Sequence, residues 1–101
     1  MVRLSPEQIV YNLSKIPGWV LLQGERLIER TLTFADFKNA ISFINQVSEF
    51  AELANHHPEM IINYNKVTLR LTTNDVNGLT GRDFALAQRI NKLYPPYEKK
   101  R

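Results

Sequence analysis

The first third of the chain combines one helical pattern with two strand patterns. Residues 5–8, Ser-Pro-Glu-Gln, place a capping serine before a proline and a glutamine, an arrangement typical of a helix start. The apolar residues that follow at helical spacing are Ile9, Leu13 and Ile16. Pro17-Gly18 interrupts this helix. Residues 19–24 and 27–32 are largely apolar on either side of a glycine-containing turn, so they predict a β-hairpin.

A long helix is predicted in the middle of the chain. Thr33 and, three residues later, Asp36 supply a capping pair in front of it. Its apolar positions form one broad stripe: Phe37, Ala40, Ile41, Ile44, Val47, Ala51 and Ala54. The helix must end near residues 55–56, because Pro58 disfavours helical geometry at the residue before it. The two adjacent histidines of the chain are therefore expected where this helix gives way to a strand.

Strand patterns return after the long helix. Residues 60–64 and 67–73 predict a second hairpin, with Asn65-Lys66 as its two-residue turn. After a short loop, Thr80 and Asp83 form a capping pair for a last helix. The apolar residues of that helix are Phe84, Ala87, Ile90 and Leu93, and Pro95-Pro96 ends it.

The predicted order of elements is α-β-β-α-β-β-α, which is typical of an α+β fold with a four-stranded antiparallel sheet and three helices on one face. The chain has 101 residues, of which 44% are hydrophobic and 23% charged, so a single domain over residues 1–101 with a packed core is expected. No apolar run approaches the ~20 residues that cross a bilayer, and the N-terminus lacks the apolar segment of a signal peptide. We therefore expect a cytoplasmic protein without a membrane partner.

The net charge of +3 does not predict nucleic-acid binding. The tail Glu98-Lys99-Lys100-Arg101 alone, with three cations and one anion, contributes +2 of it. The other lysines and arginines are scattered among acidic residues, whereas nucleic-acid-binding folds gather theirs in stripes.

Candidate chemistry centres on His56 and His57. Imidazole is the side chain whose ordinary pKa lies near cellular pH, so two of them suit proton transfer. A structural role, in which they stabilise the C-terminal end of a helix, is also open. The polar run Thr72-Thr73-Asn74-Asp75 faces the same cleft if both junctions lie at one edge of the sheet.

A metal site is disfavoured because the chain has no cysteine and no His-x-x-x-His spacing, and no Gly-x-Ser-x-Gly motif presents a serine nucleophile.

Several short motifs together resemble one known family. They are Glu52, Asn55-His56-His57-Pro58, Tyr64-Asn65-Lys66-Val67, Gly78-Leu79-Thr80, Asp83-Phe84 and Leu86-Ala87, with Gly18-Trp19 near the start. In this order and at this spacing, the pattern resembles the pterin-4a-carbinolamine dehydratases over nearly the whole chain. The resemblance implies a four-stranded antiparallel sheet with helices on one side, assembled as a homodimer or homotetramer.

The resemblance also implies a function. Members of this family remove water from 4a-hydroxytetrahydrobiopterin, the 4a-carbinolamine, and so give quinonoid dihydropterin for recycling after aromatic amino-acid hydroxylation. The reaction implies a pterin substrate, an aromatic amino-acid hydroxylase in the same pathway, and neither cofactor nor metal. A non-enzymatic interaction or assembly module remains the alternative, because the family includes dimerisation partners of a homeodomain transcription factor and relatives that assist Rubisco assembly.

Site residues follow from the resemblance position by position. The implied catalytic residues are His56, His57 and Asn74, and the implied pterin contacts are Asn55, His56, His57, Thr72, Thr73, Asn74 and Asp75. The family usually has histidine where this chain has Asn74. Asparagine can hydrogen-bond the pterin but cannot titrate, so we expect reduced activity. Asp83 is expected to cap the last helix, and Glu52 to pair with His56 one helical turn away.

Overall fold

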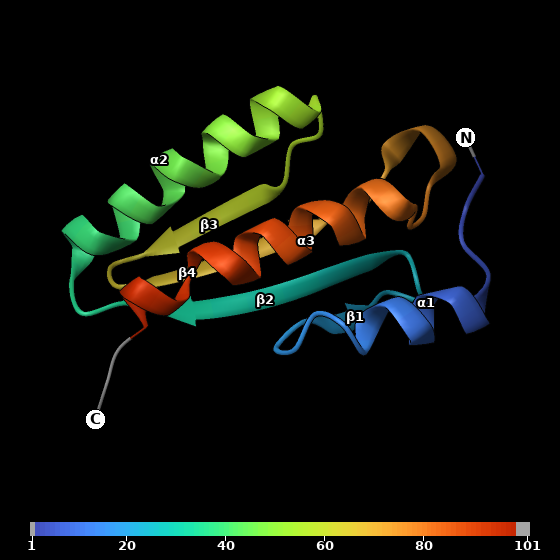
Figure 1. Cartoon of the computed structure of the whole chain (residues 1–101), viewed down its shortest axis with the longest axis horizontal. Helices are drawn as coiled ribbons and strands as arrows, with labels where there is room; N and C mark the ends of the chain where they lie inside the picture. Colours follow the sequence, from blue (N-terminus) through green and yellow to red (C-terminus); the bar gives the residue numbers. More distant parts are fainter. Residues whose placement is uncertain (1, 99–101) are drawn as a thin grey trace.

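The computed structural model describes residues 2–98 (Figure 1), so residues 99–101 of the basic tail lie outside the described part. The helices are α1 (Pro6–Leu13), α2 (Phe37–Ala54) and α3 (Gly81–Leu93), with short 3-10 turns η1 (Asn74–Val76) and η2 (Pro95–Tyr97). The strands are β1 (Val20–Leu22), β2 (Leu27–Thr33), β3 (Glu59–Asn63) and β4 (Lys66–Leu71). Their order confirms the predicted α-β-β-α-β-β-α arrangement.

The four strands form one antiparallel sheet in the order β1-β2-β4-β3. In β4, Val67, Leu69 and Leu71 are fully buried, whereas the residues between them are partly exposed. Alternate strand residues point to opposite faces, so this pattern means that one face of the sheet is covered and the other is open. The covered face continues into β2, where Ile28 pairs with Leu71.

All three helices contribute to a single hydrophobic core on that covered face. Ile9 of α1, Phe43 of α2 and Ile90 of α3 belong to one buried cluster with the apolar residues of β2 and β4. Figure 1 shows α2 and α3 running side by side across the sheet, and the two helices are in contact. Within residues 2–98, no helix combines the length and the apolar character that crossing a membrane requires.

The helix starts agree with the sequence prediction at two places and differ at one. Ser5 with Gln8, and Thr80 with Asp83, form complete capping boxes at α1 and α3. At α2 the cap is Asp36 alone, whose side chain accepts a hydrogen bond from the Asn39 amide at 2.8 Å. The expected role of Thr33 in this cap was wrong.

Thr33 is instead the last residue of β2, and the residue after it is anchored to the turn of the second hairpin. Phe34 is fully buried, and its amide donates to the Asn65 carbonyl at 2.8 Å. A second prediction fails nearby: Asn63 pairs with Lys66, so the turn of the second hairpin is Tyr64–Asn65 rather than Asn65-Lys66.

Four chain segments meet at one end of the sheet, away from the β3–β4 turn. They are the end of α2, the start of β3, the end of β4 and the start of α3 (Figure 1). Asn55 ends α2 in left-handed geometry, with φ 51° and ψ 44°, which turns the chain toward β3. The amide of His56 then donates to the Ala51 carbonyl at 3.0 Å and fixes the turn.

Candidate active site

A polar hollow of about 210 Å³ opens at the end of the sheet where these segments meet. All seven residues that the sequence predicted for the site line it: Asn55, His56, His57, Thr72, Thr73, Asn74 and Asp75. Arg82 also lines the hollow and was missed. The two stretches are separated by β3 and β4 in sequence, and the antiparallel pairing of these strands brings them together.

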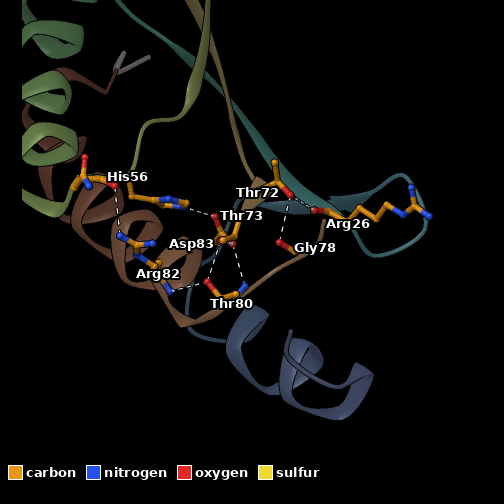
Figure 2. A network of polar contacts seen from close by, with 9 residues as sticks. Arg26, His56, Thr72, Thr73, Gly78, Thr80, Arg82 and Asp83 are labelled. Carbon is orange, nitrogen blue, oxygen red and sulfur yellow. Dashed lines mark hydrogen bonds and ion pairs between the residues drawn. The ribbon is translucent and has the colours of Figure 1, made fainter. Parts of the chain in front are cut away.

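His56 is held by a buried carboxylate. The residue is 8% exposed, and its Nε2 atom lies 2.5 Å from Oδ1 of Asp83, which is fully buried. The second carboxylate oxygen, Oδ2, accepts hydrogen bonds from the Thr73 hydroxyl at 2.8 Å and from the Thr80 amide at 3.0 Å. Figure 2 shows this network at the start of α3. Asp83 therefore caps α3, as predicted, and also fixes the imidazole of His56.

The other ring nitrogen of His56, Nδ1, is accessible to solvent. Throughout residues 2–98, no buried side-chain nitrogen or oxygen lacks a hydrogen-bond partner. Nδ1 of His56 has no partner within the protein, so it must be accessible to solvent, and the residue lines the hollow. Because the Asp83 carboxylate can only accept, the Nε2 atom carries the proton between them and Nδ1 is left with a lone pair in the neutral ring.

His57 forms a second and more exposed pair. Its Nε2 atom lies 2.5 Å from Oε2 of Glu52, and the two side chains are 55% and 77% exposed. The expected pairing of Glu52 with His56 was wrong. The left-handed backbone at Asn55 ends the helix one residue before His56, so the i, i+4 geometry of a helix no longer applies there. Each histidine thus has its own carboxylate.

The loop that follows β4 is fixed by its own hydrogen bonds. The Thr72 hydroxyl donates to the Arg26 carbonyl at 2.5 Å and to the Gly78 carbonyl at 3.3 Å (Figure 2). The Thr73 amide donates to the same Gly78 carbonyl at 2.8 Å. Asn74 and Asp75 are exposed at the start of η1 and line the hollow. The loop therefore presents one amide and one carboxylate side chain from a fixed backbone.

Arg82 supplies the cation of the hollow. Its Nη2 atom donates to the Asn55 carbonyl at 3.4 Å, so it connects the start of α3 to the end of α2 (Figure 2). The signal that would have found it is its place beside Asp83 in the first turn of a helix whose start faces the site. Among the described residues, no group of three or more His, Cys, Asp and Glu side chains gathers as a metal site does.

The fold and the hollow together define a small α+β protein with a paired-histidine site suited to proton transfer. Comparison with known proteins identifies the class more closely. A family model described as pterin 4 alpha carbinolamine dehydratase matches residues 2–93. The chain belongs to this family.

Known relatives agree with this assignment. A protein of Acidobacterium capsulatum named "Putative pterin-4-alpha-carbinolamine dehydratase" is 50% identical over 93 residues, which cover 92% of this chain and 99% of that protein. A crystal structure of a transcriptional coactivator/pterin dehydratase from Brucella melitensis matches with a TM-score of 0.88 at 34% identity, over 91% of this chain and 98% of that one. A pterin dehydratase-like protein identified as a RuBisCO assembly factor shares the fold, with a TM-score of 0.69 at 16% identity over 80% of this chain and 94% of that one.

Proposed function

We propose that this chain dehydrates 4a-hydroxytetrahydrobiopterin to quinonoid dihydropterin and water. The observation that carries the proposal is the geometry of His56, which lines the hollow with its Nε2 held by Asp83 and its Nδ1 accessible. Membership of the family supports this reaction, and the residues of this chain include groups that suit each proton transfer in it. We place the pterin ring in the hollow between the histidines and Asn74.

The reaction breaks one bond and moves two protons. The C4a–O bond breaks, and the hydroxyl group takes up a proton and leaves as water. The N5–H proton is lost at the same time, and its bonding electrons form the C4a=N5 double bond. A positioned acid and a positioned base each contribute ~10²- to 10⁴-fold to such a step.

His56 is suited to be the base. Its Nδ1 lone pair takes the N5 proton, and the resulting imidazolium is stabilised by the buried Asp83 carboxylate 2.5 Å from Nε2. The Asp83 carboxylate also prevents the ring from rotating, because the carboxylate is itself fixed by hydrogen bonds from Thr73 and Thr80. This is the arrangement of a general base oriented by a third group.

His57 is suited to be the acid. A protonated His57 donates to the 4a-hydroxyl, and Glu52 stabilises its charged form through the contact to Nε2. Both side chains are more than half exposed, so His57 can recover its proton from water after each turnover. Asn74 and Asp75 then remain to bind the heterocycle, the amide to a ring carbonyl and the carboxylate to amino and N–H donors.

The proposal is tested with the 4a-hydroxy intermediate itself. Purified protein is added to a phenylalanine hydroxylase reaction at alkaline pH, and the absorbance of the intermediate is followed. We expect the wild type to accelerate its decay and His56→Ala to lose ~10²-fold or more of that acceleration. Asn45→Ala, on the exposed side of α2, is the control and should keep full activity. Decay no faster than in a buffer blank contradicts the proposal.

A non-enzymatic assembly module is the second candidate. It is favoured by Asn74, which cannot titrate, and by the fold shared with a RuBisCO assembly factor. A chain that binds no pterin analogue but captures a specific protein partner would support the module. The expected homodimer or homotetramer fits either function, so the oligomeric state does not decide between them.

A further inference from the structure

A second, larger hollow adjoins the histidine site. It measures about 520 Å³ and runs along α2 and α3. Its apolar lining comes from both helices: Phe50, Leu53, Ala54, Ala85 and Leu86. Arg82 lines this groove as well as the histidine hollow, so the two adjoin at this residue. Leu53 is 84% exposed, which leaves a large apolar side chain of the groove open to water.

The charged residues of the groove are all cations. Arg82, Arg89 and Lys92 line it, and no acidic residue does. None of these three takes part in an ion pair among residues 2–98. The Arg89 guanidinium lies 4.5 Å from the centre of the Phe50 ring, so a cation and an aromatic face are presented together. At 1.5 Å per helical residue, Arg89 and Lys92 lie roughly 10 and 15 Å along α3 from Arg82.

Resting on the proposed function, we infer that the natural substrate is a pterin whose C6 substituent carries an aromatic spacer and terminal carboxylates, as in a reduced folate. The heterocycle occupies the histidine hollow, and the substituent passes Arg82 into the groove. The aromatic spacer packs on Phe50 and Leu53, and the carboxylates reach Arg89 and Lys92. From ring C6 to the first carboxylate such a substituent spans on the order of 10 Å. This length is similar to the distance along α3 from Arg82, where the two hollows adjoin, to Arg89.

Other pterins fit the groove less well. The short, uncharged side chain of a biopterin leaves both the apolar lining and the cations without partners. A pterin with a phosphate on a short side chain reaches Arg82 but not Arg89 and Lys92, which lie about two and three turns farther along α3. The combination of apolar lining and distant cations therefore favours carboxylates beyond an aromatic spacer over a phosphate on a short side chain.

The test compares the dissociation constants of three probes at low ionic strength: 7,8-dihydrobiopterin, 7,8-dihydrofolate and 7,8-dihydroneopterin monophosphate. The groove variant is the double substitution Arg89→Gln, Lys92→Gln. Its control is Lys38→Gln, Lys66→Gln, which removes two exposed cations that do not line the groove. We expect wild type and control to bind dihydrofolate at least tenfold more tightly than the other two probes. The groove variant should lose that preference and keep its affinity for dihydrobiopterin unchanged.

The outcomes separate this inference from the function on which it rests. If dihydrobiopterin binds and dihydrofolate binds no more tightly, or if the groove variant keeps the preference, the inference is overturned and the dehydratase proposal stands. If the phosphate probe binds most tightly, the acidic group of the substrate lies near Arg82, and the proposed substituent with an aromatic spacer and carboxylates is wrong. If none of the probes binds, both proposals fail together.

Discussion

The substitution Asp83→Asn separates the two tasks of this carboxylate. Asparagine has the same shape, but only one of its two terminal atoms accepts hydrogen bonds, and the other donates. In the wild type, Oδ2 faces two donors, the Thr73 hydroxyl and the Thr80 amide, and Oδ1 faces His56 Nε2. If the new amide NH₂ faced the Thr80 N–H, two hydrogen-bond donors would point at each other. The amide NH₂ must therefore turn toward His56.

That orientation changes the tautomer of His56. Because Nε2 now faces a donor, it must become the acceptor, so the ring proton moves to Nδ1, the accessible ring nitrogen. A protonated Nδ1 cannot take a proton from substrate, so we expect kcat to fall by ~10²- to 10⁴-fold. The dissociation constant for a pterin analogue should change little, because Asn74 and Asp75 are untouched.

The expected cost in stability is modest. Two hydrogen bonds to a charged acceptor become bonds to a neutral one, at about 1 kcal/mol each, and the bond to His56 is reversed rather than lost. Asp83 is fully buried, so solvent does not screen these contacts. The free energy of unfolding should fall by about 2–3 kcal/mol, and urea denaturation measures it.

A matched control keeps lost stability from being mistaken for lost catalysis. Ser5→Ala destroys the other complete capping box, at α1, which lies outside the lining of the histidine hollow, and costs about 1 kcal/mol. It should unfold more easily and keep full activity. If Asp83→Asn loses the expected stability but its kcat stays within twofold of wild type, the tautomer of His56 does not control the reaction and our assignment of the base is wrong.

Two further changes give equally direct outcomes. Asn74→His restores a titratable group to the hollow and should raise kcat about tenfold or more in the 4a-hydroxy decay assay, and an unchanged rate would show that position 74 does not limit turnover. Burial raises the pKa of Tyr94, whose hydroxyl donates to the Thr33 carbonyl at 2.7 Å. The unfolded chain therefore ionises first, so this contribution to stability is complete below about pH 10 and is lost as the pH rises through the raised pKa. Tyr94→Phe should be less stable than wild type by about 1 kcal/mol at pH 8, and urea denaturation should show this difference shrinking above pH 10.

The fold was predictable because its signals are local. Capping residues, proline positions and alternating strand residues act within a few residues of one another, and they gave the element order and both capping boxes correctly. The failures came from contacts distant in sequence. Thr33 looked like part of a helix cap, but burial of Phe34 and its hydrogen bond to Asn65, 31 residues later, anchor that segment to the turn of the second hairpin.

The site shows the same division between local and distant contacts. The sequence predicted that His56 and His57 would lie near Asn74, because both chain junctions were expected at one edge of the sheet. An antiparallel hairpin produces this arrangement when its strands are of similar length. The hydrogen-bond partner of His56 could not be predicted from the sequence, because Asp83 lies 27 residues away and already had a local role as a helix cap. A carboxylate has two oxygens, and in Asp83 the cap uses one and the histidine the other. A buried acid at a helix start should therefore be examined for what its second oxygen contacts before a capping role is taken as its whole explanation.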